Sequence, residues 1–362
     1  MNPYSTKLAE AFAATIISVF FESAVAPLIT NKNYEGDIKD QATIVNIPTV
    51  GGATLKNYTG ADLTADDIEE SAGQLKTDQA KAYYFKVKSL DKLESFIKNP
   101  EGELLDQVRG LLQESVDAYV LGLYGDVAAG NRVGTDYSTG TVEVTVTTGA
   151  VAGNSTVFTA AMVGRGFKAD GHSAWYRVKS RSSNTAIVIE DDLDDVTSAY
   201  TGGAISAGAS YKIEAATAVQ VTKSTIYAKI LELSQKLNDR KVPKTDRWLV
   251  LPSALGNLVR QAPEYIPAVA AAYTDVVQNG FITKMGGFMI YENEEVSGDS
   301  TNGYHVMAGH ISAITFAMAM TETEIEAQLI GNFGKAYKGL NVYGAKVVDE
   351  RRKALAEGFW KL

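Results

Sequence analysis

Residues 99–129, NPEGELLDQVRGLLQESVDAYVLGLYGDVAA, form the stretch that decides how the rest of the chain is organised. Asn99 is a favourable N-cap and Pro100 suits the first helical position. Apolar residues then recur at helical spacing from Leu104 to Val127, and polar residues occupy the other side. The pattern predicts one helix of roughly 29 residues, about 43 Å long at 1.5 Å per residue. A rod with one apolar side predicts a spine along which other elements pack.

The composition of the 362-residue chain indicates a globular protein without disulfide bonds. Hydrophobic residues make up 45% of the chain, which is enough for a sizeable core. The length predicts about two to three domains of roughly 150 residues. The absence of cysteine excludes disulfides, thiolate metal sites and cysteine nucleophiles. The net charge of −9 disfavours a reader of nucleic acid, because such a surface repels phosphate backbones.

Residues 1–40 predict an N-terminal arm, a helix followed by an irregular segment. Its apolar residues, among them Phe12 and Phe20, keep helical phase, and Glu10 and Glu22 lie on either side of the apolar run. This placement of charge favours an amphipathic arm over the alternative of a cleaved secretion signal. The apolar run is too short to span a membrane, so no membrane contact is expected.

Two strand patterns, Thr43–Val50 and Ala80–Ser89, flank a polar stretch from Leu55 to Gln79. The second pattern alternates strictly, which is typical of a strand with one buried face. The polar stretch is far too long for a tight hairpin turn and has no core of its own, so we expect it to protrude. A two-stranded arm of this kind is marginally stable alone and is expected to lie on another molecule.

Residues 131–217 differ in texture from the rest and predict a small all-β domain between two helical segments. The acidic run from Glu190 to Asp195 within it predicts a solvated loop, and a cation site is the alternative, although the EF-hand spacing is missing. The stretch Gly164–Ala169 matches a dinucleotide-binding pattern formally, but it opens no predicted helix and is interpreted as a coincidence.

The remainder of the chain predicts an α/β unit. A helix is expected over Thr225–Leu237, a buried strand over Arg247–Leu251 and another strand over Phe288–Tyr291. One or two further strands are expected in His305–Met320. Leu340–Val348 is predicted to be the last strand before a charged tail, residues 349–353.

No catalytic, cofactor or metal site emerges from the sequence. His305 and His310 are five residues apart in a strand pattern, which places them on opposite faces and prevents them from sharing a metal. The motifs HExxH and GxSxG and a Walker loop are absent. We therefore expect a protein that is not an enzyme and that has no cofactor.

Three groups of residues, in this order, resemble the major capsid proteins of tailed bacteriophages, whose fold is shared with encapsulin shells. Residues 34–38 followed by 43–48 resemble the entry into that family's extended loop. Val242-Pro243 with residues 246–252 resembles the strand that enters its axial domain, and residues 280–291 resemble the turn and strand that follow. The likeness covers nearly everything except residues 131–217.

The resemblance implies an α+β fold with a long spine helix, an extended β-hairpin loop, an α/β axial domain and an all-β insertion domain. The implied divisions are an N-terminal arm (1–40), an extended loop hairpin (41–89), the spine helix of a peripheral domain (90–130), the insertion domain (131–217), an axial domain (218–300) and return strands (301–362).

The resemblance further implies a major capsid protein that self-assembles into the icosahedral head shell around phage double-stranded DNA and matures by subunit rotation and loop rearrangement. The implied partners are copies of itself as pentamers and hexamers, a scaffolding protein and a portal, with DNA contacted non-specifically. Assembly is expected in the host bacterial cytoplasm and the mature location in the virion capsid. The alternatives are an encapsulin-like bacterial nanocompartment shell, another extended virion or tail protein, and a carbohydrate-binding module centred on the β-rich segment.

Some relatives join subunits through a lysine–asparagine crosslink, and Lys56 and Asn57 are adjacent here, but no catalytic glutamate for that reaction is identified. The candidate assembly contacts are Phe12, Phe20, Tyr34, Lys56, Asn57, Tyr58, Asp62, Asp66 and Tyr84.

Overall fold

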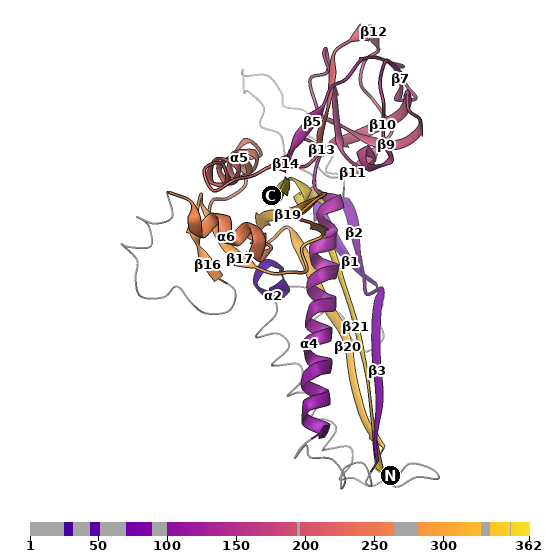
Figure 1. Ribbon diagram of the computed structural model, residues 1–362. Helices are drawn as coiled ribbons and strands as arrows, with labels where there is room; N and C mark the ends of the chain where they lie inside the picture. Colours follow the sequence, from indigo (N-terminus) through magenta and orange to yellow (C-terminus); the bar gives the residue numbers. More distant parts are fainter. Residues whose placement is uncertain are drawn as a thin grey trace, which may run out of the picture.

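The computed structural model describes residues 25–31, 44–50, 70–88, 100–193, 196–263, 281–326, 334–347 and 349–362. The chain is an α+β protein with many strands and few helices. Three parts follow one another along its long axis: a narrow limb, an α/β body and a β lobe (Figure 1). No helix of the described ranges is long and apolar enough to cross a membrane.

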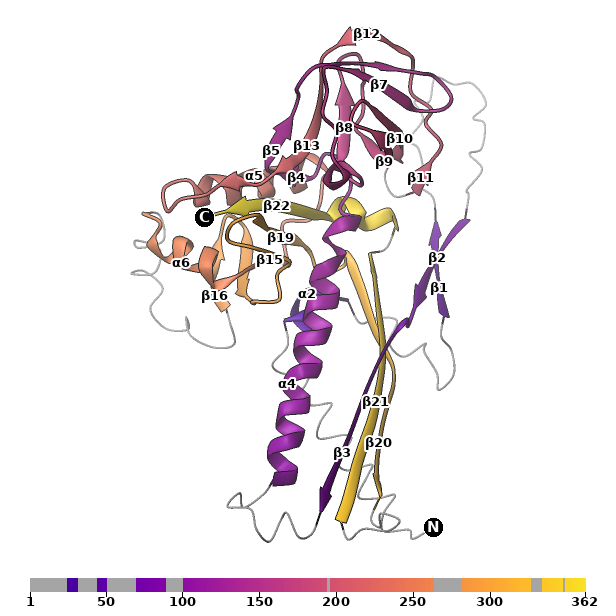
Figure 2. The ribbon, with the colours of Figure 1, turned by 45° about the vertical axis from the view of Figure 1, so that its right-hand side comes forward.

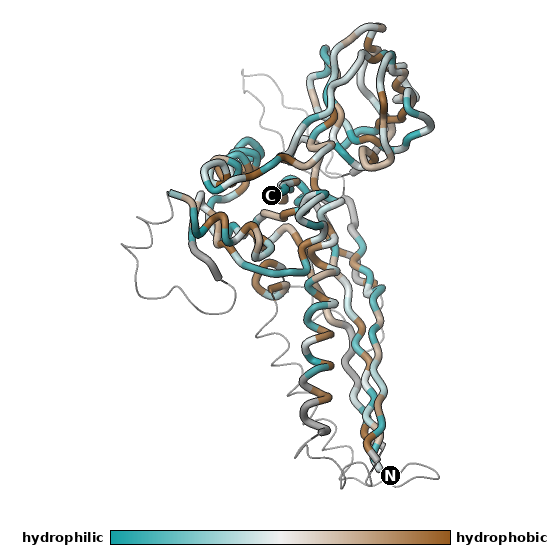
Figure 3. Tube along the Cα trace, viewed as in Figure 1, coloured by the Kyte–Doolittle hydropathy of each residue, from teal (hydrophilic) through white to brown (hydrophobic). Residues whose placement is uncertain are grey.

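The limb consists of one helix beside one small sheet, as Figure 2 shows. The helix is α4 (Pro100–Leu121), and the antiparallel sheet has the order β20-β21-β3, from β20 (Ile314–Glu326), β21 (Gly334–Val347) and β3 (Gln79–Lys88). Along the limb, hydrophobic and hydrophilic positions are interspersed (Figure 3), as expected for single layers with one buried side. In the part of the chain that the structure describes, the limb has two layers, and β3 and β20 are the edge strands of its sheet.

Helix α4 is shorter than predicted. It ends at Leu121, and residues Gly122–Asp126 form a 3₁₀ turn, η2. Gly122 and Gly125 explain the difference, because glycine has low helix propensity and 3₁₀ turns are common at helix ends. The buried side of α4 is nevertheless the predicted one, with Leu112 and Val116 in the main core.

The predicted hairpin pairs differently from expectation. Strand β1 (Ile44–Val50) pairs with β2 (Glu70–Lys76), which lies inside the stretch predicted to be an unstructured protrusion. The alternating strand β3 pairs with β21 instead. Strand β2 has few apolar residues and was not predicted, but Leu75 opposite Val45 is fully buried, so tertiary pairing overrides weak local propensity.

The body is built on an eight-stranded sheet of order β14-β22-β19-β15-β17-β16, with β18 on β19 and β4 on β22. Helices α5 (Ile226–Asp239), α6 (Ser253–Gln261) and the single turn α2 (Ala26–Ile29) pack with it around one core that extends to the upper part of α4. The strands are β4 (Arg132–Val133), β14 (Val219–Gln220), β15 (Arg247–Leu251), β16 (Phe281–Met285), β17 (Phe288–Glu292), β18 (Gly298–Asp299), β19 (Gly303–His310) and β22 (Leu355–Lys361).

Several predictions for the body are confirmed by these elements. Helix α5 buries Ile226, Ile230, Leu233 and Leu237, and all five residues of β15 are buried. The strand predicted over Leu340–Val348 is present as part of β21, but it is not the last strand. The charged segment (η4, Asp349–Ala354) leads into β22, a buried strand between β19 and the pair β4 and β14. The sequence of β22 contains Glu357 and Gly358, which masked its core position.

The β lobe, residues 135–217, has a nine-stranded antiparallel sheet and a core of its own. Its largest fully buried side chains are Phe158, Phe167, Ile187 and Ile189. The Gly164–Ala169 motif leads into strand β8 and not into a helix. The elements are β5 (Thr135–Tyr137), β6 (Thr141–Val144), β7 (Ala150–Asn154), η3 (Ala160–Met162), β8 (Gly166–Ala169), β9 (Tyr176–Ser183), β10 (Ala186–Leu193), β11 (Val196–Ser198), β12 (Ile205–Ala209) and β13 (Tyr211–Thr217).

Candidate functional site at the junction of the body and the β lobe

The chain enters and leaves the β lobe beside one strand of the body. On entry, β4 runs parallel to β22 at Glu357 and Gly358, and on exit β14 runs parallel to β22 at Trp360 and Lys361. Both crossings are thus tied to β22. The polar side chains that meet here form the most heavily charged buried region that the described residues contain.

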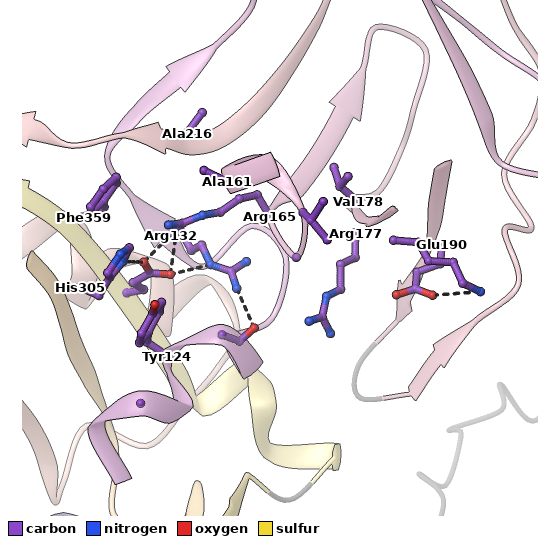
Figure 4. A pocket seen from close by; sticks show the side chains of 16 residues that line it. Tyr124, Arg132, Ala161, Arg165, Arg177, Val178, Glu190, Ala216, His305 and Phe359 are labelled. Atoms are coloured by element: carbon purple, nitrogen blue, oxygen red, sulfur yellow. Dashed lines mark hydrogen bonds and ion pairs between the residues drawn. The ribbon is translucent and has the colours of Figure 1, made fainter. Parts of the chain in front are cut away.

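Glu357 is the centre of this junction. Its buried carboxylate accepts hydrogen bonds from Arg132 Nε at 2.7 Å, from Arg165 Nη1 at 2.9 and 3.0 Å, and from His305 Nδ1 at 2.7 Å (Figure 4). Burial alone would raise the pKa of Glu357, but the hydrogen bond from His305 and the charges of Arg165 and Arg132 hold it at about 2. One carboxylate therefore joins β22, β4 and β19 to the turn before β8 of the lobe.

Glu214, in the middle of β13, provides a second bridge. It accepts from Arg132 Nη1 at 3.1 Å, from the Gly130 amide at 2.8 Å and from the Gly166 amide at 3.0 Å. A Cβ atom on Gly166 would lie 2.3 Å from a Glu214 oxygen, so this close approach requires glycine. Burial tends to lower the pKa of Arg132, but the carboxylates of Glu357 and Glu214 raise it, so Arg132 stays charged between them.

Asp192 on β10 binds a third point of the body. Its carboxylate accepts from the Ala129 amide at 2.5 Å and from Arg352 Nη1 at 2.6 Å. Neighbouring Asp191 is also buried and accepts from the Thr201 amide at 3.1 Å. The prediction of a solvated acidic loop is wrong for these two residues, because strand pairing places them inside and each finds donors there. No group of three or more His, Cys, Asp or Glu residues among the described residues could hold a metal ion.

The ring of His305 is held between two aromatic rings. Tyr124 stacks on one face at 4.1 Å between centroids and Phe359 on the other at 4.4 Å. The Arg165 guanidinium lies 5.3 Å from the centroid of Phe359. This stack orients His305 toward Glu357. His310, in contrast, lies at the other end of β19 with its Nδ1 2.8 Å from Ser312 Oγ.

A cavity of about 580 Å³ opens beside the network and is lined by residues of both the lobe and the body (Figure 4). Its charged lining residues are Arg132, Arg165, Arg177, Lys179, Glu190, His305 and Glu357. It has room and hydrogen-bond donors for a small polar ligand.

A separate buried carboxylate, that of Asp117, holds the segment 25–31 against helix α4 of the limb. Asp117 of α4 accepts from the amides of Val25 at 3.1 Å and Ala26 at 2.9 Å, and from Asn293 Nδ2 at 2.7 Å. Burial raises the pKa of Asp117, and these hydrogen bonds act against that rise. Asp117 thereby caps α2 and joins it to the loop after β17.

Of the predicted assembly contacts, Tyr84 is the one that lies among the described residues. Tyr84, on the edge strand β3, is 55% exposed, with Lys86 Nζ 5.3 Å from its ring centroid. The other predicted contacts, Phe12, Phe20, Tyr34, Lys56, Asn57, Tyr58, Asp62 and Asp66, lie outside the described residues.

Sequence reasoning missed the whole junction. The one signal that could have found it is Glu357 itself, a single acid between Leu355-Ala356 and Phe359-Trp360. A lone charge within an apolar strand pattern indicates a buried partner, because an unpaired buried charge is costly.

No protein-family model matches the chain, and no curated protein matches it. Solved structures do match. A chain of Mycobacterium phage Che8 is 16% identical, with a TM-score of 0.51, and the match covers 91% of this chain and 89% of that chain. A chain of the capsid structure of the cyanophage P-SCSP1u is 12% identical, with a TM-score of 0.53, over 92% of this chain and 86% of that one. A chain of the capsid of Ralstonia phage GP4 is 10% identical, with a TM-score of 0.53, over 94% of this chain and 91% of that one.

Proposed function

Because the chain has the fold of phage capsid proteins, we propose that it is a major capsid protein, which self-assembles into the icosahedral head shell around phage double-stranded DNA. The observation that carries the proposal is the match to solved capsid chains over about nine-tenths of both partners. None of the alternatives, an encapsulin-like shell, a tail protein or a carbohydrate-binding module, is favoured by a specific observation in the described residues.

The limb supports the proposal on physical grounds. It has two layers, two edge strands and exposed apolar or aromatic side chains, among them Leu111 of α4, which is 65% exposed. Edge strands and exposed apolar side chains are a liability in an isolated protein, since they pair or aggregate. Obligate assemblies bury large surfaces, often above about 2,000 Å² in total. In a shell, neighbouring subunits would cover this limb.

In this proposal the parts take the roles that the resemblance implies. Residues 1–40 are the N-terminal arm, 41–89 the extended loop and 90–130 the spine of the peripheral domain; the β lobe (131–217) is an insertion domain, 218–300 the axial domain and 301–362 the return strands. Pentamers and hexamers form with a scaffolding protein and a portal in the bacterial cytoplasm. The shell matures by rotation of rigid subunits and movement of the arm and the loop. An acidic chain would contact DNA only non-specifically.

The candidate contacts extend the proposal to the surfaces where subunits meet. The eight outside the described residues belong to the arm and the extended loop, and Tyr84 belongs to the limb. We infer that both surfaces contact neighbours.

Expression of the full chain, with and without a scaffold candidate, tests the function by negative-stain microscopy. Closed shells or capsomers are the expected products. A strictly monomeric, compact species under all conditions would contradict the proposal.

A deletion tests the extended loop separately. Replacing residues 51–69 by a two-residue Asn-Gly turn keeps the pairing of Val50 with Glu70, so the subunit should keep its circular dichroism spectrum and lose the ability to form particles. Normal particles from this variant would mean that the loop has another role.

A further inference from the structure

We propose that the cavity between the body and the β lobe is a binding site for a phosphate-class oxyanion, held by Arg177 together with Arg165 and Lys179. The inference rests on side chains of the described residues and does not depend on the proposed function.

Arg177 is a half-buried cation on β9 whose side chain lines the cavity. Among the described residues this side chain makes no hydrogen bond and no ion pair, and Asp192 and Asp126 act on it only through their charge. In Figure 4 the Arg177 side chain lies between the Arg132 group and Glu190, and no dashed line reaches its guanidinium. Gly164 lies beside it with a φ of +81°, and a Cβ atom there would be 3.6 Å from Arg177 Nη2. That distance is an ordinary contact, so the left-handed φ, and not a lack of space, is what favours glycine at this position.

The surrounding cations have donors to spare. Arg165 uses Nη1 for both oxygens of Glu357, and its Nε and Nη2 make no hydrogen bond among the described residues. Arg352 pairs with Asp192 through Nη1, but its buried Nη2 has no hydrogen-bond partner in the described structure. Arg352 does not line the cavity, so the spare donors available to a ligand there are those of Arg165.

The acids that face this region are mostly neutralised already. Glu357 and Asp192 are bound by arginines, and Glu190 lies 3.6 Å from Lys179, whose side chain is 60% exposed. Asp126 and Asp192 favour the charged form of Arg177. Burial and the charges of Arg352 and Arg132 act against them, and the net effect lowers the pKa of Arg177. Arg132 is bound by Glu357 and Glu214, Arg165 by Glu357 and Lys179 by Glu190, so Arg177 is the one cavity-lining arginine or lysine without an ion pair among the described residues.

Phosphate chemistry fits this arrangement. A guanidinium presents a planar fork of donors that matches phosphate oxygens, and a tetrahedral oxyanion can accept from two arginines and a lysine at once. The anion could be free inorganic phosphate or a phosphate of a DNA backbone. In either form the anion would join β9 to the turn before β8 and stabilise the position of the lobe on the body.

Calorimetric titration of inorganic phosphate into the full chain, in chloride buffer of constant ionic strength, tests the site. We expect saturable binding that the substitution Arg177→Gln weakens about 10-fold or more, since a charge-assisted hydrogen bond is lost. The matched control is Arg351→Gln, which removes an exposed arginine outside the cavity lining and should bind phosphate as the unmodified chain does.

A second arm uses a short DNA duplex in place of phosphate. Tight duplex binding that depends on Arg177 identifies the backbone as the source, and phosphate binding alone identifies the free ion. Hydrogen exchange of the unmodified chain should show slower exchange at residues 163–166 and 176–179 with the bound anion, a measurement that needs no variant. The proposal is overturned if neither anion binds, or if both arginine variants bind alike. Particle formation is not measured, so failure here leaves the capsid proposal untouched.

Discussion

The β lobe and the limb lie at opposite ends of the molecule and are stabilised in opposite ways (Figure 1). The lobe closes around its own aromatic core, and its buried Arg165, Asp192 and Glu214 meet partners at the junction. The limb exposes Leu111 and Tyr84, and among the described residues the outer edges of β3 and β20 have no strand partner. The lobe core is thus formed by lobe residues alone, whereas the described part of the limb leaves apolar surface exposed. Substitutions in the two regions should therefore affect different measurements.

The largest effect is expected from Glu357→Ala at the lobe junction. It leaves Arg132, Arg165 and His305 around an empty buried position, and breaking such a group costs about 3–5 kcal/mol. Urea unfolding of the full chain measures the loss. The control is Glu324→Ala on the limb, whose ion pair with Lys338 is largely exposed and contributes about 0–1 kcal/mol. Equal losses in the two variants would show that the junction does not stabilise the subunit.

A pH series sharpens the same contrast. The pKa of Glu357 falls from its ordinary 4.5 to about 2 in the folded chain, so its stabilisation is present above pH 4.5 and is lost as the pH falls toward 2. At 1.36 kcal/mol per unit this amounts to about 3 kcal/mol. Asp117, whose pKa is raised, acts in the opposite sense, because protonation favours its folded form. Urea unfolding between pH 7 and 3 should show a shallower slope for Glu357→Gln than for Glu324→Gln, and parallel slopes would refute the assignment.

A smaller and local effect is expected from Asp117→Ala. The substitution leaves the amides of Val25 and Ala26 without their acceptor, at a cost of about 1–3 kcal/mol. Hydrogen exchange should speed up at residues 25–29, while the lobe core around Phe158 keeps its protection. Faster exchange in both regions would instead indicate global destabilisation.

The smallest effect on the free energy of unfolding is expected from substitution of Leu111, an exposed residue of the limb. Leu111→Ala should change the free energy of unfolding by less than about 0.5 kcal/mol, because the side chain is exposed. Leu112→Ala, one residue further along the chain and buried, should cost about 2–5 kcal/mol. If neighbours cover the limb, Leu111→Asp should reduce particle yield in negative-stain images while the isolated subunit unfolds normally. Unchanged yield would place Leu111 outside any subunit contact.

Sequence reasoning succeeded where burial follows a simple period. Helix α5 and strand β15 were predicted because their apolar residues alone determine the pattern. It failed where a partner from far along the chain decides the outcome. Strand β2 forms because β1 pairs with it, and Glu357 is buried because Arg132 and Arg165 reach it. No local pattern contains the identity of such partners, so β22 and most of the junction could not be predicted.

The pairing of β4 and β14 with β22 has a consequence for the order of events during synthesis. The ribosome makes the β lobe before most of the body strands. Because the lobe core consists of lobe residues alone, the lobe can fold while translation continues. Its seat on the body does not exist until Leu355–Lys361 emerge. A nascent chain would thus carry a folded lobe next to an incomplete body. The lobe would take its final position relative to the body only after almost all of the body had been translated. Such a delay would limit premature contacts between growing chains on neighbouring ribosomes.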